Sequence, residues 1–65
     1  MNPQSSEQLQ SLEVVIGRTS LKRSSIYAKI AAGDFPPPVK ISANRVAWPA
    51  SRVDAWIASK IAEAA

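Results

Sequence analysis

The sequence contains neither cysteine nor histidine among its 65 residues. Without cysteine no disulfide can brace the fold, and without either residue type a zinc site lacks its usual ligands. A chain of this length forms one domain and buries only about 60% of the surface that it exposes when unfolded. We therefore expect a single small domain that binds no metal and no cofactor and depends on its apolar core alone.

Long apolar runs are also missing. No stretch approaches the roughly 20 apolar residues that span a membrane, and no signal peptide precedes the polar opening segment 1–8. The apolar content of 46% is nevertheless ordinary for a globular domain. These features predict a cytoplasmic protein that does not bind membranes.

Acidic residues are few and isolated. Five carboxylates are scattered singly along the chain: Glu7, Glu13, Asp34, Asp54 and Glu63. A catalytic site needs several titratable groups that converge in a pocket. No histidine or cysteine stands beside any of these carboxylates, so the sequence predicts no catalytic residues and a protein that is not an enzyme.

Positive charge is concentrated in the middle of the chain. The net charge is +3, but the stretch 17–48 holds six cations against one anion, Asp34. The six cations are Arg18, Lys22, Arg23, Lys29, Lys40 and Arg45. Charge that is gathered in one part of a small protein indicates a polyanionic partner.

The first half of the chain predicts two helices joined by a tight turn. Residues 1–8 show no periodicity, so we expect a flexible leader ahead of a domain that spans 9–65. Apolar residues in 9–16 recur at helical spacing, with Ser11 as the N-cap. A glycine then follows, and the segment 17–20 is expected to interrupt the helix and form the turn.

A second helix is predicted over residues 23–32. Ile26 and Ile30 are four residues apart and define its buried stripe. Gly33 marks the end of the helix, because glycine accepts the left-handed conformation without steric cost. Phe35 is expected to fold back onto the core. The opposite, outward face carries Arg23, Ser24, Tyr27, Ala28 and Ala31.

A stiff connector and a β-hairpin follow. The prolines at 36–38 lack the backbone N–H and can form neither a helix nor a central strand. Residues 39–41 alternate apolar and basic positions, and residues 45–48 do so less strictly. The turn residues at 42–44 include Asn44, which tolerates positive φ. An isolated hairpin is unstable, so this one must pack on the helices.

The last part of the chain predicts a third helix. Pro49 suits its first turn, where the missing N–H costs nothing. Asp54 in the first half and Lys60 near the end agree with the helix dipole. One apolar face is formed by Val53, Trp56, Ile57 and Ile61. We assign Phe35, Trp48 and Trp56 to the core, in preference to a stacking platform for single-stranded nucleic acid.

This order of elements and residues resembles the AlpA family of small phage and prophage regulators, which are related to excisionases and MerR-type proteins. The resemblance covers roughly residues 12–61. The matching residues are Thr19, Leu21, Arg23, Ser24, Ser25, Ile26, Tyr27, Gly33, Phe35, Pro36, Pro38, Val39, Lys40, Arg45, Val46, Ala47, Trp48, Val53, Trp56 and Ile57. It implies a mainly α fold with a small β-hairpin, the winged helix-turn-helix.

The resemblance also implies a function. The second helix would enter the major groove of double-stranded DNA, and the hairpin would serve as a wing on the minor groove or backbone. Such a nucleoid-associated protein regulates transcription of mobile-element genes, or acts as a recombination directionality factor that helps an integrase excise the element. A module this small has a limited footprint, so we expect several copies to bind adjacent sites cooperatively, with possible bending of the DNA.

The chain departs from the family pattern just before the second helix. Family members usually have glycine, leucine and serine where this chain has Ser20, Leu21 and Lys22. Ser20 must then accept the backbone conformation of the turn, at about 1 kcal/mol if its φ is positive. Lys22 replaces a capping hydroxyl. Either it reaches a DNA phosphate, or the helix start is weak and Ser24 or Ser25 satisfies the free N–H groups.

On this interpretation two sets of residues contact DNA. The recognition helix contributes Lys22, Arg23, Ser24, Ser25, Tyr27, Ala28 and Lys29. The wing contributes Lys40, Asn44 and Arg45. Arginine reading guanine is the commonest specific contact, and a basic hairpin beside a basic helix suits the minor groove.

Other roles remain open for individual residues. Arg23 and Lys29 are also compatible with a solvated surface, Ser25 with a cap, and the ring of Tyr27 with the core. Charges on the hairpin also guard a free strand edge against aggregation. The alternative function is a protein-interaction adaptor, which recruits an integrase or another phage protein without reading DNA.

Overall fold

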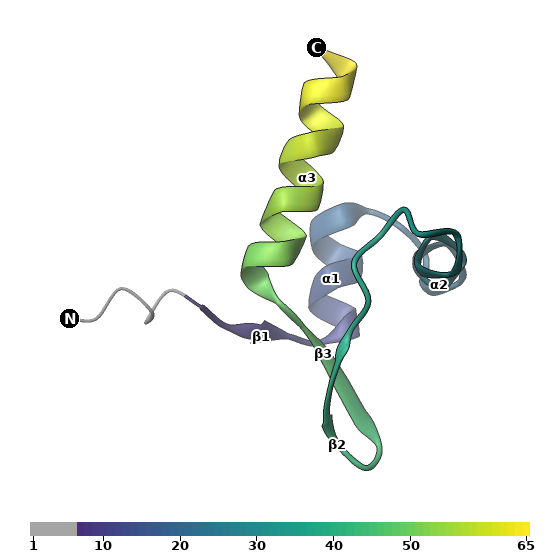
Figure 1. The fold of residues 1–65 in the computed structure, drawn as a ribbon, viewed down its shortest axis with the longest axis vertical. Coiled ribbons are helices and arrows are strands. Elements are labelled where there is room, and N and C mark those ends of the chain that lie inside the picture. The colour runs from purple at the N-terminus through teal and green to yellow at the C-terminus, as the bar shows by residue number, and fades with distance from the viewer. Residues whose placement is uncertain (1–6) are drawn as a thin grey trace, which may run out of the picture.

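The computed structural model describes residues 7–65, which form three helices and a small three-stranded antiparallel sheet (Figure 1). The helices are α1 (Leu12–Thr19), α2 (Arg23–Ala32) and α3 (Ala50–Ala64). The strands are β1 (Leu9–Gln10), β2 (Val39–Ser42) and β3 (Arg45–Pro49). The fold is mainly α, as predicted. In the described part of the chain, no helix is long and apolar enough to cross a membrane.

The N-terminal side of the fold differs from the prediction. The first six residues of the predicted leader lie outside the described residues, and its seventh, Glu7, is hydrogen-bonded to the first turn of α3. Helix α1 begins at Leu12, because the Ser11 hydroxyl accepts a bond from the Val14 amide at 3.3 Å. Leu9–Gln10, expected to be helical, is strand β1. The predicted N-cap is therefore confirmed, whereas the predicted start of the helix is wrong.

The end of α1 was also predicted wrongly. Gly17 lies inside the helix, which continues to Thr19. Nothing lies within 4 Å of the position that a Cβ on Gly17 would occupy, so the glycine serves no packing need there. A helix-interior glycine costs only about 1 kcal/mol relative to alanine. The packing of its neighbours Val15 and Ile16 on the core outweighs this cost.

The turn between α1 and α2 depends on the side chain of Thr19 and the backbone of Ser20. Ser20 adopts the left-handed conformation with φ 64°, and its amide donates to the Ile16 carbonyl at 2.9 Å. The Thr19 hydroxyl donates to the Val15 carbonyl at 2.9 Å and accepts from the Leu21 amide at 3.3 Å. The turn therefore occupies residues 20–22 rather than 17–20. The φ of Ser20 is positive, which is the case in which the sequence predicted a cost of about 1 kcal/mol.

Helix α2 spans 23–32, as predicted, and ends in a Schellman motif. Gly33 has φ 81°, and its amide donates to the Ile30 carbonyl at 3.1 Å. The amide of Asp34 donates to the Lys29 carbonyl at 2.7 Å. This reversal of the chain returns Phe35 to the core, where it is 3% exposed. The predicted stop and the predicted burial are both confirmed.

The sheet has the strand order β1-β3-β2. The predicted hairpin is present, but its turn comprises only residues 43–44, because Ser42 belongs to β2 and pairs with Arg45. Asn44 does not adopt positive φ, which among the described residues is confined to Ser20 and Gly33. The added strand β1 was not predicted, since two residues are too few for an alternating pattern.

The core is small and centres on Trp48. Its fully buried or nearly buried members come from every layer: Val15, Ile26, Phe35, Trp48 and Val53. The Trp48 indole donates to the Pro36 carbonyl at 2.9 Å, which ties the proline connector to β3. Trp56 is half-buried, packs edge-on against Phe35 at 4.9 Å and donates to the Asp34 carbonyl at 2.7 Å. The assignment of the three aromatic residues to the core is confirmed, with Trp56 at its margin.

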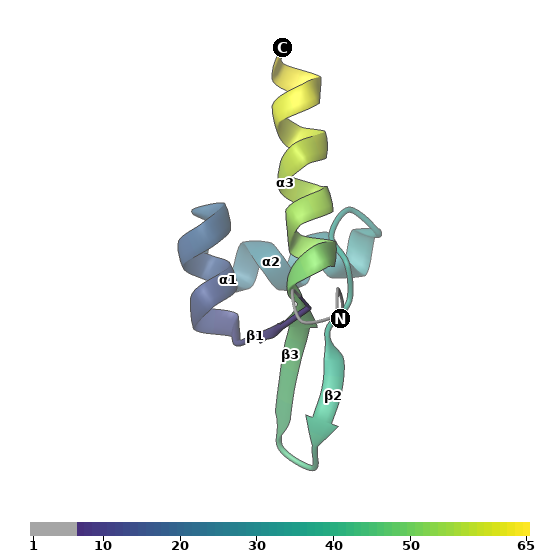
Figure 2. The ribbon, with the colours of Figure 1, turned by 90° about the vertical axis from the view of Figure 1, so that its left-hand side faces the viewer.

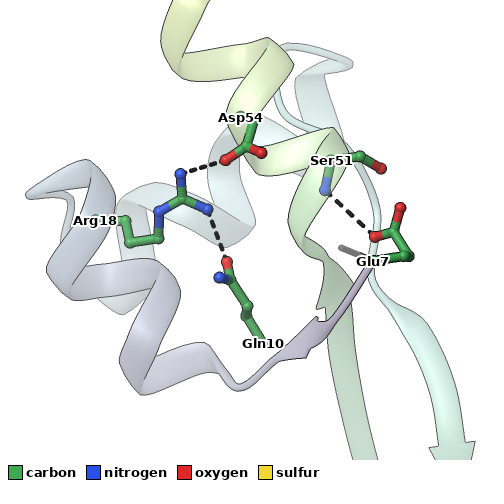
Figure 3. A network of polar contacts seen from close by, with 5 residues as sticks. All are labelled: Glu7, Gln10, Arg18, Ser51 and Asp54. Carbon is green, nitrogen blue, oxygen red and sulfur yellow. Dashed lines mark hydrogen bonds and ion pairs between the residues drawn. The ribbon is translucent and has the colours of Figure 1, made fainter. Parts of the chain in front are cut away.

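Helix α3 begins at Ala50, and Pro49 occupies its N-cap position rather than its first turn. The first turn holds no acidic residue of its own. The Glu7 carboxylate accepts from the Ser51 amide at 3.3 Å (Figure 3). The Gln8 carbonyl accepts from the Ala50 amide at 2.7 Å. Two of the free N–H groups of α3 are thus satisfied by the N-terminal segment, whereas Asp54 lies beyond the first turn.

The far half of α3 extends beyond the body of the domain (Figures 1 and 2). Along the predicted apolar face, Val53 is buried, Trp56 and Ile57 are half-buried, and Ile61 is 66% exposed. The face is therefore continuous in sequence, but only its first half has something to pack against.

Candidate nucleic-acid interface

The outward face of α2 is the first part of the candidate site. Ile26 is fully buried and Ile30 half-buried, so the helix is oriented as the spacing predicted. The residues exposed on the other side are Arg23, Ser24, Tyr27, Ala28 and Ala31. Ser25 and Lys29 lie at the border between the two faces and are half-buried. The face holds one cation, one hydroxyl, one phenol and small side chains, and no acid.

The N-terminus of α2 is open and positively charged. Lys22 occupies the N-cap position with φ −74° and ψ 160°, and its side chain caps no amide. Within residues 7–65 the hydroxyls of Ser24 and Ser25 form no hydrogen bond either, so the alternative cap considered from the sequence is absent. The first turn of the helix therefore has no side-chain cap beside Lys22 and Arg23. A helix end of this kind favours an anion.

Tyr27 connects α2 with the sheet. Its ring meets the Trp48 ring edge-on, with 6.5 Å between centroids and 63° between planes. The residue is nevertheless 41% exposed. Tyr27 therefore combines the two roles considered from the sequence, since one edge of its ring touches the core and the rest faces solvent.

The hairpin is the second part of the candidate site, and its register separates the two wing cations. Lys40 pairs with Val46, which lies two residues from Trp48, so these three share a face of the sheet. This is the face that contacts α2 through Trp48 and Tyr27. Arg45 is next to Val46 and lies on the opposite face. Lys40 is therefore on the helix side of the wing, whereas Arg45 is at the tip on its other side.

Ion pairing separates the cations of the basic stretch 17–48 into two groups. The ion pairs among the described residues are Arg18 with Asp54 and Lys60 with Glu63. Five cations of the stretch, on α2 and its N-cap and on the hairpin, have no anionic partner within residues 7–65: Lys22, Arg23, Lys29, Lys40 and Arg45. Arg52 in α3 is unpaired in this part of the chain as well, but it lies outside the basic stretch. Arg18, which the sequence grouped with the five, instead binds α3. The tertiary structure thus narrows the basic stretch to two elements.

The two elements border one side of the molecule. Figure 1 shows α2 end-on beside the sheet, with the hairpin extending away from the body, and the far half of α3 points in the opposite direction. Figure 2 shows from a second direction that α2 passes behind the first turns of α3, above the hairpin, and that the hairpin tip projects away from the helices. A rod-like partner can therefore meet α2 and the hairpin together without touching the end of α3.

One further surface feature, an apolar groove, involves no residue of the outward face of α2 or of the hairpin. In the described part of the chain, no group of three metal-binding side chains occurs. An open groove of about 580 Å³ lies between the end of α2, the proline connector and α3. Its walls are mainly apolar, and its charged members are Asp34 and Arg52. The sequence did not predict this groove, because it is formed by segments that are distant along the chain.

Comparison with known proteins assigns the chain to a family. The profile of the family described as Prophage CP4-57 regulatory protein (AlpA) matches residues 9–61, which include all the helices and strands except the end of α3. The chain therefore belongs to the AlpA family of prophage regulatory proteins. The resemblance recognised from the sequence is confirmed.

A curated relative comes from a bacterial virus. Uncharacterized protein ORF88 of Enterobacteria phage P4 is 50% identical to this chain over 42 residues. The aligned part is 65% of this chain and 48% of the phage protein. The chain thus matches about half the length of that relative.

Proposed function

We propose that the chain is a sequence-specific double-stranded DNA-binding protein with a winged helix-turn-helix architecture. Helices α1 and α2 with the turn between them form the helix-turn-helix, the β2–β3 hairpin is the wing, and α3 supports both. The observation that carries the proposal is that five of the six cations of the stretch 17–48 lie on α2, at its N-cap and on the hairpin, and that none of these five forms an ion pair within residues 7–65. Membership of a prophage regulatory family supports it.

The recognition helix is α2. An α-helix fits the major groove, and the residues near its N-terminus contact base edges. Arg23, Ser24 and Tyr27 supply donors or acceptors on the exposed face, while Ala28 permits close approach or contact with a thymine methyl. In the proposed complex Ser25 contacts the DNA backbone from the border of this face.

The remaining contacts of the proposal are with the phosphate backbone and the minor groove. Lys22 and the free amides at the start of α2 bind one phosphate, and Lys29 approaches another farther along the helix. On the wing, Lys40 contacts the phosphates of the DNA strand that passes between the recognition helix and the hairpin. Asn44 and Arg45 at the tip enter or border the minor groove.

The decisive experiment starts from the sequences that the protein selects. Genomic fragments and random duplexes retained by the chain are sequenced, and binding to the selected duplex is followed by gel shift across a range of salt. With four to six phosphates contacted, log affinity is expected to fall against log salt with a slope of about −4 to −5. Binding without salt dependence would contradict the proposal.

A pair of double variants sharpens this test. Arg23→Ala with Arg45→Ala removes one cation from each proposed element and is expected to abolish specific binding. Arg52→Ala with Lys60→Ala removes the same charge from α3 and is expected to retain it. Equal losses of affinity in both double variants would show that binding depends only on net charge. That result would contradict the assignment of the DNA contacts to α2 and the wing.

The biological role proposed is control of a prophage or another mobile element. The same architecture serves a transcriptional regulator and an excision factor, so the position of the sites decides between them. A footprint over a promoter assigns regulation, and one beside an attachment site assigns excision together with a recombinase. Several copies are proposed to bind adjacent sites cooperatively, which a gel shift on one site against an array measures.

An adaptor is the second candidate function. The exposed Ile61 and the projecting half of α3 favour it, because that surface is not used for folding. In this case the partner is an integrase or another phage protein. The Arg23→Ala, Arg45→Ala variant discriminates the two functions, since an adaptor that does not read DNA keeps its partner.

A further inference from the structure

The hairpin carries apolar side chains that the fold does not bury. Val39 is 36% exposed, Ile41 45% and Val46 38%. None of them belongs to the core cluster or packs against it. Every residue of β2 is exposed, and the hairpin extends away from the helices (Figures 1 and 2).

Ile41 differs from the other two in its place in the strand pairing. Val39 pairs with Ala47 and Val46 pairs with Lys40, whereas Ile41 falls at a register shift between Lys40 and Ser42 and has no partner across the ladder. An extra residue of this kind bends its strand and re-aims its side chain. The adjacent turn lacks positive φ, so it does not supply the strand twist that the primed hairpin turns provide. The bulge supplies twist beside it.

The charges around Ile41 indicate what it meets. The hairpin has two cations, Lys40 and Arg45, and no anion. Neither cation has an ion-pair partner among the described residues, and Arg45 lies on the opposite face from Lys40. Ile41 thus lies between one cation on each face of the hairpin. This arrangement is complementary to the DNA minor groove, because the two walls of the groove carry phosphates and its floor is formed by base edges and sugars.

We propose that Ile41 is a wedge that enters the minor groove and bends the duplex. The inference rests on the proposed function and adds a mechanical role for one wing residue. An inserted aliphatic side chain partly unstacks a base step, and such wedges kink DNA by about 20–90°. The kink costs least at pyrimidine–purine steps, so the wedge also favours these steps without any hydrogen bond to a base.

The test uses the full chain and the duplex that it selects from a random pool, labelled with a donor and an acceptor dye at its ends. Ile41→Ala is expected to remove at least half of the bend while reducing affinity by about tenfold or less. Val39→Ala is the matched control, because it truncates an exposed aliphatic on the same strand that has a cross-strand partner. Ile41→Leu is expected to restore the bend. A 2-aminopurine at the step beneath the wing is expected to brighten on binding, and to do so less with Ile41→Ala.

The outcomes separate the wedge from the proposed function. Retention of the full bend by Ile41→Ala, or specific binding by the natural chain without a bend, overturns the wedge and leaves DNA binding intact. Failure of the natural chain to bind any duplex overturns both. If Ile41→Ala instead loses self-association in sedimentation at an unchanged bend, the aliphatic surface belongs to a second copy and the wedge is excluded. Circular dichroism of each variant verifies that the fold is retained.

Discussion

The guanidinium of Arg18 at the end of α1 donates to the carboxylate of Asp54 in α3 and, at 2.9 Å, to the Gln10 amide oxygen in β1 (Figure 3). One side chain thereby connects three segments that are distant in sequence. The side chains of Arg18 and Asp54 are 30% and 60% exposed, so solvent screens their attraction. The contact matters for function mainly because it withdraws Arg18 from the basic surface.

Arg18→Gln is expected to separate stability from DNA binding. Loss of the exposed ion pair should lower the free energy of unfolding by about 0.5 kcal/mol, measured by urea denaturation. The salt dependence of DNA binding should remain unchanged, because Arg18 contacts no phosphate in the proposed complex. If the slope of log affinity against log salt became shallower by about one unit, Arg18 would have to contact a phosphate after all.

Lys22→Ser is expected to change stability and DNA affinity in opposite directions. Serine at the N-cap of α2 can accept from the first-turn amides, which should raise the free energy of unfolding by about 1 kcal/mol. The same change removes a proposed phosphate contact, so affinity should fall and the salt slope should shrink by about one unit. Thermal denaturation and gel shifts on one preparation measure both. An unchanged slope would show that Lys22 does not reach the backbone.

Ser20→Gly is expected to stabilise the domain. Ser20 has φ 64°, and glycine adopts the left-handed conformation without the steric penalty of a Cβ. The gain should be about 0.5–1 kcal/mol after the greater chain entropy of unfolded glycine is included. Gly33→Ala is the reciprocal control. Open space surrounds its missing Cβ, so its expected loss of about 1 kcal/mol reflects the φ of 81° alone. Stabilities that move together would contradict the backbone argument.

Glu7→Ala is expected to weaken the start of α3. The carboxylate accepts from the Ser51 amide, and α3 has no acid in its first turn, so a loss of about 0.5–1 kcal/mol is expected. Hydrogen exchange of the Ser51 amide should accelerate more than that of amides in α2. Glu7→Gln retains an acceptor oxygen and should lose less. Unchanged exchange at Ser51 in Glu7→Ala would exclude the remote cap.

Local sequence patterns were sufficient for much of the fold and for part of the candidate site. Ile26, Ile30 and Gly33 predicted the orientation and the end of α2, because helical spacing and a left-handed cap are local properties. The hairpin followed from alternation and turn residues. The predictions failed where a tertiary contact opposes a local preference. At Gly17 the low helix propensity of glycine predicted the end of the helix, but the packing of neighbouring residues on the core keeps the helix intact.

Several features of the site required long-range contacts. Three contacts join residues that are 36 to 44 positions apart in the sequence. They are the pairing of β1 with β3, the capping of α3 by Glu7, and the ion pair that holds Arg18 on Asp54. A charge pattern cannot reveal which cation already has a partner. Nor can alternation reveal a bulge, because the register of two strands is set by the turn and by what each face packs against.

By itself the sequence determined the family, the three helical segments, the hairpin and the enrichment of positive charge in 17–48, since these depend on residue type and spacing. Only the tertiary structure decided which part of that stretch forms a candidate surface. Packing around Trp48 brings α2 close to the wing. The strand register places Lys40 and Arg45 on opposite faces of the hairpin. The ion pair with Asp54 excludes Arg18 from the candidate surface. Charge is a property of residues, whereas an interface depends on which of those charges the fold leaves unpaired and side by side.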